Sequence, residues 1–405
     1  MIKKQNFITF ATMKSSSIML KSNGEERLSY IIKSHNAKLK ENGCNCKEIE
    51  HVTPIVKVVD YCNFSCGFCR YAKNDKKSTM DFETYKIIVE KACDYNVSHN
   101  CNHLTLVYHG GEPLLWGISN YERAMALQKE LKRKYPYICF HNNIQTNGYL
   151  INPQWIDFFK ANDFNIGISI DGPDEINFHG NSVESQRVLS NIHELGLAKC
   201  SFGILSVITD DHRRSADAYY DFLVKNEIHS VGLCFCVYDE KSGKTVTNDV
   251  LTGFLTRLFE RYYLGSHALS IREFEYPMRY WLGLDFPLCT YSFRRKCGNY
   301  YSISSNGDVN FCDPFSLNGS LVGNLFNCSF NDIKSSSEMK KIKTMAIISA
   351  RQECDKCDIK NICGGGCFRH VLPSGKHAFC DTFKALYPLI KQTISNSMYS
   401  SYFEN

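Results

Sequence analysis

Apolar residues follow two different periodicities along the middle of the chain. From residue 54 onward, short apolar runs typical of buried strands alternate with longer segments in which apolar residues recur at helical spacing. Since strands that alternate with crossover helices pair in parallel, this order predicts an α/β fold with a parallel sheet, open or curled into a partial barrel. The predicted strands are residues 55–60, 104–109, 138–145, 165–170, 200–208 and 231–236, and the predicted helices between them are 81–95, 119–134, 153–161, 184–195 and 213–225.

The segments on either side of these strands have other patterns. An apolar stripe along residues 251–263 predicts a helical connection after the last strand. Beyond residue 289, Cys, Gly, Asn and Ser replace the helical periodicity, and such a segment buries too little apolar surface to fold without metal ligands. The predicted regions are an N-terminal extension (1–50), a sheet core (51–240), a helical bridge (241–288), a Cys-rich domain (289–385) and a C-terminal tail (386–405).

Composition and charge exclude several classes of protein. Hydrophobic residues make up 43% and charged residues 22% of the 405 residues, which is typical of a globular protein, and no apolar run is long enough to cross a bilayer. Lys14 interrupts the one apolar stretch near the N-terminus, so we expect no secretory signal and a cytoplasmic protein without a membrane partner. The formal net charge of +5 comes without a basic block, so nucleic acid is not an expected partner.

The twenty cysteines change this picture, because a chain without a secretory signal is not expected to pair them as disulfides. Many reduced thiols indicate metal binding, and eleven of them fall into groups with ligand-like spacing. We interpret the other nine as structural, although Cys234 and Cys236 lie on one face of a strand and one of them could reach the cavity. These nine are Cys44, Cys46, Cys93, Cys101, Cys139, Cys200, Cys234, Cys236 and Cys328.

The first cysteine group directly follows the first predicted strand. Cys62, Cys66 and Cys69 form a CxxxCxxC loop. Three thiolates at this spacing can bind three irons of one 4Fe-4S cubane and leave the fourth iron without a protein ligand. An open iron can chelate the amino and carboxylate groups of S-adenosylmethionine (SAM) and reduce its sulfonium. The alternatives are a zinc knuckle, which needs a distant fourth ligand, and three buried structural thiols.

This loop resembles the signature of the radical SAM superfamily, which follows the first strand of a partial (β/α)6 barrel and has an aromatic residue before its third cysteine. Phe68 occupies that place. The next predicted strand ends in Gly110, Gly111, Glu112 and Pro113, and in the family such a GGEP segment binds the SAM amino group. Glycines there let the backbone approach a ligand closely. Without this position, GGEP could equally be an ordinary turn.

Two further segments, QTNG at residues 145–148 and SIDGP at 169–173, resemble those of anaerobic sulfatase-maturing enzymes and related peptide maturases. The resemblance implies that Ser169 and Asp171 lie near SAM or substrate. It also implies that Arg187 pairs with the SAM carboxylate, although a solvated helix charge is the alternative. Leu205 is expected to face the adenine with its backbone.

The C-terminal third contains the pattern Cys297-x9-Gly307-x4-Cys312, followed by Cys354-x2-Cys357-x5-Cys363-x3-Cys367 and then Cys380. This pattern resembles the SPASM domain, the auxiliary-cluster module of radical SAM maturases, and Cys289 adds an eighth thiol. Eight thiols suffice for two fully ligated 4Fe-4S clusters, while two four-cysteine zinc sites are the alternative. By the family's order, one cluster takes Cys289, Cys297, Cys312 and Cys367, and the other takes Cys354, Cys357, Cys363 and Cys380. In the sulfatase-maturing members an aspartate after the third of these cysteines accepts a substrate proton, which makes Asp313 the candidate catalytic base. An Asx turn before Pro314 is the alternative.

Together these resemblances imply a radical SAM oxidoreductase with three 4Fe-4S clusters and SAM as cofactors. Reductive cleavage of SAM would give a 5'-deoxyadenosyl radical that abstracts hydrogen from a peptide or protein, with a flavodoxin- or ferredoxin-type electron donor. The first hypothesis is a maturase of a ribosomally made peptide that forms an oxidised residue or a thioether or carbon-carbon crosslink. Its rival is an anaerobic sulfatase-maturing enzyme that makes formylglycine, and a zinc-stapled binding protein is the alternative from another class.

Overall fold

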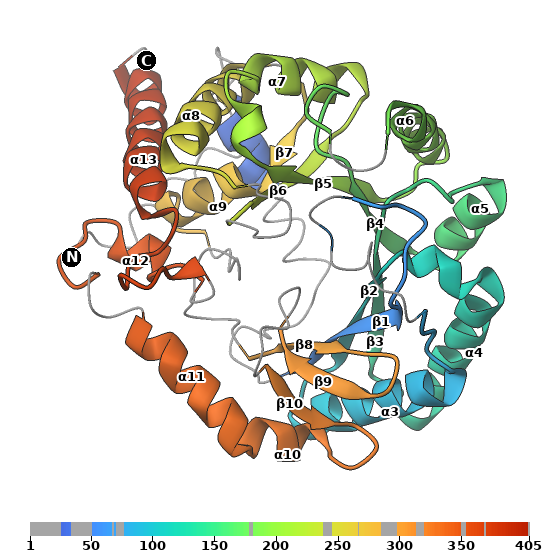
Figure 1. Cartoon of the computed structure of the whole chain (residues 1–405). Coiled ribbons are helices and arrows are strands. Elements are labelled where there is room, and N and C mark those ends of the chain that lie inside the picture. Colours follow the sequence, from blue (N-terminus) through green and yellow to red (C-terminus); the bar gives the residue numbers. More distant parts are fainter. Residues whose placement is uncertain are drawn as a thin grey trace.

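One ten-stranded sheet organises the computed structural model of the chain, with the strand order β10-β9-β8-β1-β2-β3-β4-β5-β6-β7. Strands β1 to β7 pair with one another in parallel, and β8 pairs in parallel with β1. Strand β9 pairs antiparallel with both β8 and β10. Figure 1 shows the sheet curved into an arc with helices along its outer side. The structure describes residues 26–33, 51–66, 69, 77–177, 181–237, 245–265, 267–284, 298–312, 320–349, 354–367 and 370–403.

The strands and helices have the following bounds. The strands are β1 (Thr53–Val59), β2 (His103–Gly110), β3 (Cys139–Thr146), β4 (Phe164–Ser169), β5 (Phe202–Ile208), β6 (Ser230–Phe235), β7 (Ser270–Ile271), β8 (Tyr300–Ile303), β9 (Asp308–Phe311) and β10 (Leu321–Asn324). The α-helices are α3 (Phe82–Ser98), α4 (Ile118–Lys134), α5 (Pro153–Ala161), α6 (Ser182–Leu197), α7 (Ala216–Lys225), α8 (Asn248–Leu264), α9 (Arg272–Trp281), α10 (Phe330–Ser335), α11 (Ser337–Ser349), α12 (Lys360–Cys363) and α13 (Cys380–Phe403). Two 3-10 turns are η3 (Pro113–Trp116) and η4 (Asp210–His212).

The predicted α/β fold with a curled parallel sheet is confirmed. All six predicted strands overlap β1 to β6, and the five predicted crossover helices correspond to α3 to α7. Local capping explains where several helices begin, because the side chains of Asp81, Asn152 and Asn181 each accept a backbone N–H in the first turn of α3, α5 and α6. Pro153, which lacks a backbone N–H, occupies the first position of α5, where no intrahelical donor is needed.

The alternation of side chains along β2 to β5 separates an outer face from an inner one. In β2, Leu104, Leu106 and Tyr108 are fully buried, whereas the residues between them are only partly buried. The same alternation continues in β3, β4 and β5. Since neighbouring residues of a strand point to opposite faces, one face packs under the helices and the other lines the inside of the arc.

The Cys-rich region joins the same sheet, which the sequence pattern did not predict. Strand β8 pairs in parallel with β1 in the register Thr53↔Tyr300 to Val56↔Ile303. Helix α13 continues to Phe403 and packs on α8 and α9, with Leu386, Ile390 and Ile394 buried. The boundary predicted after residue 385 therefore falls inside a helix, and the residues predicted as a tail up to 403 belong to it.

Helix α9 connects the sheet to the Cys-rich region. It packs against β6 and α13, and the Tyr276 hydroxyl donates to the Ile362 carbonyl at 2.7 Å, next to Cys363. Within α9, the Arg279 guanidinium contacts the Glu275 carboxylate at 3.1 Å, and both side chains are buried. A second helical pair, Arg257 with Glu260 on α8, is half exposed.

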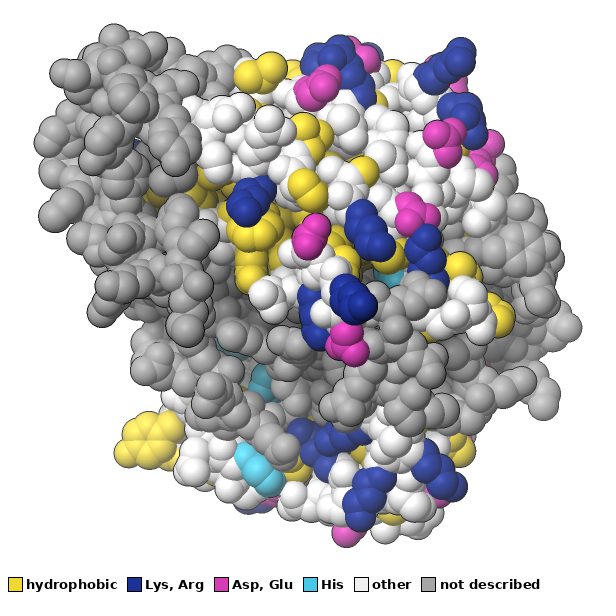
Figure 2. Space-filling model, turned by 90° about the vertical axis from the view of Figure 1, so that its left-hand side faces the viewer, with side chains coloured by type: hydrophobic (Ala, Val, Ile, Leu, Met, Phe, Trp, Pro, Cys, Tyr) yellow, Lys and Arg dark blue, Asp and Glu magenta, His cyan; other side chains and the backbone are white. Residues whose placement is uncertain are grey.

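The side of the molecule that carries α11 and α13 faces the viewer in Figure 2. It shows Lys and Arg side chains beside exposed hydrophobic ones, with Asp and Glu among them. Among the described residues, no helix is both long enough and apolar enough to span a membrane.

Replacing Glu275 by Ala is expected to destabilise the fold by about 3–5 kcal/mol, because it leaves a buried guanidinium without this carboxylate. Glu260→Ala removes the exposed pair on α8 and is expected to change stability little, since solvent screens its charges. Thermal unfolding followed by circular dichroism measures both variants. Equal shifts of the two midpoints would contradict the role assigned to the α9 pair.

Candidate functional site

Two main-chain segments meet at the carboxyl ends of β1 and β2. The Gly111 N–H donates to the Val59 carbonyl at 2.9 Å, and the Glu112 N–H donates to the Tyr61 carbonyl at 2.9 Å. Tyr61 directly precedes Cys62, so these bonds join the GGEP segment to the beginning of the cysteine loop. The two motifs that the sequence placed at neighbouring strand ends are therefore in direct contact.

Glycine is required at both positions of this contact. A Cβ atom on Gly110 would lie 2.1 Å from the Val59 carbonyl oxygen, and one on Gly111 would lie 1.8 Å from the Tyr61 carbonyl oxygen. Both obstacles are backbone atoms, so no rotation of a side chain could relieve the clash. Gly110 also has a φ of +124°, which L side chains rarely adopt.

Glu112 is buried and accepts three hydrogen bonds. Its Oε1 accepts from the Leu114 N–H at 3.0 Å and the Thr146 hydroxyl at 2.7 Å, and its Oε2 accepts from the Asn147 N–H at 2.8 Å. Burial nevertheless raises the pKa of this carboxyl to about 7, against which the hydrogen bonds act. An added cation would favour the ionised form. The carboxyl is thus suited to binding a positively charged group.

Cys62, the first thiol of the cysteine loop, lies near this carboxyl. Burial is the main cause that raises the pKa of Cys62 to about 11, and the charges of Glu112 and Cys69 add to it. The Asn147 side-chain amide donates to Cys62 Sγ at 3.6 Å, and the Cys69 N–H donates to the Cys66 carbonyl at 3.0 Å. Such partly buried thiols lose their protons on binding metal, so this donor set fits an iron-sulfur cluster.

Aromatic residues connect Arg187 to the cysteine loop. The exposed Arg187 guanidinium lies over the Tyr149 ring, 4.2 Å from its centroid. Tyr149 in turn packs edge to face against Phe64, at 5.5 Å between centroids. Phe64 is buried inside the loop, between Cys62 and Cys66. The cation predicted to pair with a carboxylate is therefore held on the side of the cysteine loop.

The SIDGP segment follows β4 and is tied to β5. Asp171 is fully buried, and its Oδ1 accepts the Val207 N–H at 2.7 Å. The Ser169 hydroxyl accepts from the Gln145 amide at 2.9 Å, and the Leu205 carbonyl accepts the Ile170 N–H at 3.2 Å. Asp171 thus holds two strand ends together, while the partly buried Ser169 lies on the inner face of the sheet.

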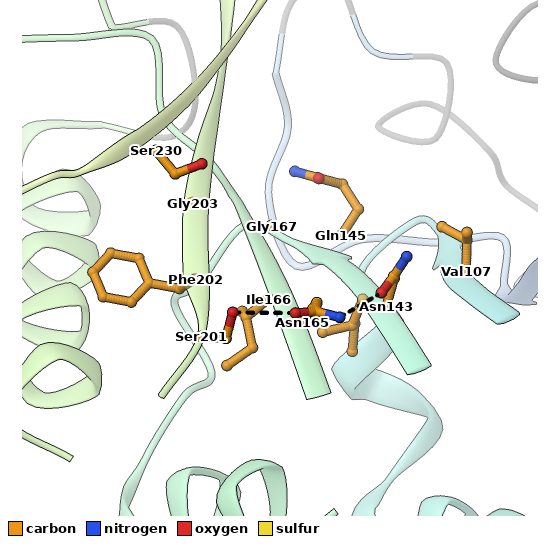
Figure 3. A pocket seen from close by; sticks show the side chains of 11 residues that line it. Val107, Asn143, Gln145, Asn165, Ile166, Gly167, Ser201, Phe202, Gly203 and Ser230 are labelled. Atoms are coloured by element: carbon orange, nitrogen blue, oxygen red, sulfur yellow. Dashed lines mark hydrogen bonds between the residues drawn. The ribbon is translucent and has the colours of Figure 1, made fainter. Parts of the chain in front are cut away.

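A pocket of about 450 Å³ lies on this inner face, near the amino ends of β4, β5 and β6. Its side chains are uncharged. Figure 3 shows the amides of Asn143 and Asn165 and the Ser201 hydroxyl joined in a row across three strands, with both hydrogen bonds at 3.1 Å. Gln145 lines the pocket and also contacts Ser169, so the pocket adjoins the strand ends that carry the site.

Four C-terminal thiols come together around α12. The pKa of Cys363 is raised to about 12, mainly by burial and also by the charges of Cys354, Cys380 and Cys357. Among the described residues, no three His, Cys, Asp or Glu side chains converge on a single metal ion. Thiols are ligands of both zinc and iron-sulfur clusters.

The remaining predicted site residues include two cysteines whose backbone the structure describes and four residues that it does not describe. Cys312, with a φ of +62°, directly follows β9, and Cys367 lies after α12. Phe68, Cys289, Cys297 and Asp313 lie outside the described residues.

Three residues of the site had no role in the sequence interpretation, namely Thr146, Asn147 and Tyr149. Thr146 and Asn147 donate to Glu112, and Tyr149 carries Arg187. Their position at the carboxyl end of a predicted parallel strand, inside and just after QTNG, was the available signal.

Comparisons with known proteins agree with this geometry. Residues 56–219 match the radical SAM superfamily, and residues 295–358 match an iron-sulfur cluster-binding domain, SPASM.

Several relatives cover most of the chain. A cysteine-type anaerobic sulfatase-maturating enzyme of Clostridium perfringens is 28% identical over 327 residues, covering 76% of this chain and 86% of the relative. A serine-type enzyme of Bacteroides thetaiotaomicron is 26% identical over 342 residues, covering 76% and 80%. An uncharacterised protein of Methanocaldococcus jannaschii is 30% identical over 296 residues, covering 72% and 92%.

Solved structures show the same fold. The structure of anSMEcpe with bound AdoMet has a TM-score of 0.74 at 24% identity, covering 85% of this chain and 99% of that one. Streptococcus suis SuiB bound to the precursor peptide SuiA has a TM-score of 0.59 at 18% identity, covering 86% and 78%. With both family matches, the thiol loop and the GGEP contact in agreement, the chain belongs to the radical SAM superfamily and is an enzyme with a C-terminal SPASM domain.

Proposed function

We propose that this enzyme oxidises a Cys or Ser side chain of a protein or peptide by radical SAM chemistry, as in sulfatase maturation. The observation that carries the proposal is the contact between the Cys62 loop and the GGEP segment, which places a thiol beside a buried carboxyl. The relatives named as sulfatase-maturating enzymes support this substrate class, and they move it ahead of the peptide crosslinking that the sequence favoured.

In this proposal Cys62, Cys66 and Cys69 hold a 4Fe-4S cluster. With SAM on its open iron, such a cluster supplies the electron that cleaves SAM to methionine and a 5'-deoxyadenosyl radical. The chain's own residues position these groups: Asn147 donates to Cys62 Sγ, and Phe64 fills the loop from inside. An electron donor of the flavodoxin or ferredoxin type would reduce the cluster.

Glu112 is the proposed partner of the SAM amino group. Its carboxyl is buried and already accepts three donors, and an ammonium group would offset the cost of its ionisation. Gly110, Gly111 and Pro113 form the rest of this segment. Arg187 is placed to bind the SAM carboxylate, since its guanidinium stacks on Tyr149 beside the loop. Ser169, Asp171 and Leu205 complete the proposed surroundings of SAM.

The C-terminal thiols are proposed to hold two auxiliary 4Fe-4S clusters. The neighbouring charges of Cys354, Cys357, Cys363 and Cys380 support the second set directly. For the first set, Cys289, Cys297, Cys312 and Cys367, the support is the resemblance to the SPASM pattern and the family match. These clusters would accept the electron that the substrate loses, and Asp313 is the candidate base for its proton.

Replacing Cys62, Cys66 and Cys69 together by Ala is expected to abolish SAM cleavage, because the cluster that reduces SAM loses its ligands. Iron should fall from about twelve to about eight per chain, as the auxiliary clusters remain. The measurements are iron content after anoxic reconstitution and 5'-deoxyadenosine release after reduction with dithionite. Cleavage retained by this variant, or a colourless zinc protein, would contradict the proposal.

The product distinguishes sulfatase-type maturation from crosslinking. Incubation with SAM, reductant and a short peptide carrying a sulfatase-type Cys or Ser motif is expected to convert that residue to an aldehyde, detected by mass spectrometry after hydrazine trapping. A peptide that only loses two hydrogens and resists hydrazine would indicate a crosslink instead.

Gly111→Ala is expected to remove iron from the SAM-binding cluster and abolish SAM cleavage, since the added methyl group meets the Tyr61 carbonyl at 1.8 Å. Gly253 in α8 is a matched control, because a Cβ there has no atom within 4 Å. Gly253→Ala should keep full iron and activity. The measurement is the iron content of both variants. Equal iron contents would show that the close approach of Gly111 to Tyr61 is not needed to hold the cysteine loop.

Glu112 is expected to make SAM binding depend on pH. Because burial raises the pKa of this carboxyl to about 7, the carboxyl is mostly protonated in mild acid when SAM is not bound. The ammonium group of SAM needs the ionised carboxylate as its partner. Affinity should therefore rise about fivefold between about pH 6 and about pH 7, below the range in which the amine itself loses its proton.

Isothermal titration calorimetry of the reconstituted enzyme measures this dependence. Glu112→Gln replaces the titrating carboxyl by an amide. SAM should therefore bind this variant more weakly, and its affinity should depend less on pH, although the Cys62 thiol is still present. An unchanged profile in this variant would assign the titration to another group.

A further inference from the structure

His377 carries a buried N–H that the proposed function has not used. Its side chain is 7% exposed, and the ring packs against Phe383 at 5.5 Å between centroids. The Phe379 N–H donates to His377 Nδ1 at 3.2 Å. Since Nδ1 accepts a hydrogen bond, the ring must carry its proton on Nε2.

That Nε2–H has no hydrogen-bond partner among the residues that the structure describes. An unsatisfied buried donor costs about 1–3 kcal/mol, so such groups normally have a partner. A cofactor sulfur beside the ring would supply the missing acceptor.

The ring points at the turn between two cluster cysteines. A Cβ atom on Gly366 would lie 2.6 Å from both Cδ2 and Nε2 of His377, so this edge of the ring rests on the Gly366 backbone. The Gly366 N–H donates to the Cys363 carbonyl at 3.0 Å, and the Cys380 N–H donates to the His377 carbonyl at 3.0 Å. His377 is thereby bonded through its backbone to Cys380, and its ring contacts a glycine that is bonded to Cys363.

A short hairpin fixes the ring in this place. Val371 and His377 form an antiparallel bridge, and the Leu372 N–H donates to the Lys376 carbonyl at 2.9 Å. Gly366 has a φ of +69°, a conformation that glycine adopts without strain, and any side chain there would collide with the imidazole. Glycine at this position therefore leaves room for the ring beside the segment between Cys363 and Cys367.

We propose that His377 Nε2–H donates a hydrogen bond to a sulfur of the auxiliary cluster held by Cys354, Cys357, Cys363 and Cys380, and thereby raises its reduction potential. The inference rests on the proposed function, which supplies the cluster. A hydrogen bond to sulfur stabilises the reduced cluster, which is the more negative form. His377 is thus a positioning residue that makes this cluster a better acceptor for the electron leaving the substrate.

The test is a redox titration followed by electron paramagnetic resonance in the full chain with Cys62, Cys66 and Cys69 replaced by Ala, so that only auxiliary clusters contribute. In this background His377→Phe, which removes the donor, is expected to make reduction of one cluster about tenfold less favourable, about 59 mV for a one-electron couple. His377→Gln keeps an N–H at a similar reach and should restore most of the shift. His193→Leu, on the exposed side of α6, is the matched control and should change neither potential.

A second measurement does not depend on a folded variant. Pulsed paramagnetic resonance of the otherwise unaltered background, labelled with 15N-histidine, should show a weak nitrogen coupling to one reduced auxiliary cluster. This inference alone would be overturned if His377→Phe bound its full iron with unchanged reduction potentials, or if no nitrogen coupling to an auxiliary cluster were detected. A chain that binds no iron would instead contradict the proposed function.

Discussion

The site depends on the close approach of two backbones at the carboxyl ends of β1 and β2. Because the GGEP segment and Tyr61 meet through main-chain atoms, the distance between the cysteine loop and the Glu112 backbone is set by peptide geometry and not by side-chain rotamers. Side chains exchange rotamers within nanoseconds, whereas paired backbone moves only with its strands. A radical reaction that must position its cofactor within fractions of an ångström gains from this rigidity.

The polar groups around this contact come from a third strand. Thr146 is the last residue of β3 and Asn147 follows it, and both donate to Glu112, while the Asn147 amide also donates to Cys62 Sγ. Three consecutive parallel strands therefore contribute the thiol, the carboxyl and the donors that connect them. All hydrogen bonds of this network form only when the three strands are in register. The geometry of the site therefore depends on the strand pairing of the sheet.

The sequence was sufficient to predict the first six strands, because their apolar runs alternate with crossover helices without interruption. It also placed the chemistry at the strand ends, since parallel strands bring their carboxyl ends together. It did not reveal β8 to β10, whose four-residue lengths carry too little pattern, or α13, where Pro388 inside the helix weakens the helical signal. The stacking of Arg187 on Tyr149 could not be predicted either, because it depends on how two loops approach in space.

The pairing of β8 with β1 has a consequence for how the two halves of this chain relate. All seven residues of β1 are buried, and its backbone is bonded on one side to β2 and on the other to β8 from the Cys-rich half. A protein cut before residue 298 would leave β1 as an open sheet edge with apolar side chains on both faces, which is a template for aggregation. The radical SAM half and the Cys-rich half therefore share one sheet, and we expect neither to fold well without the other.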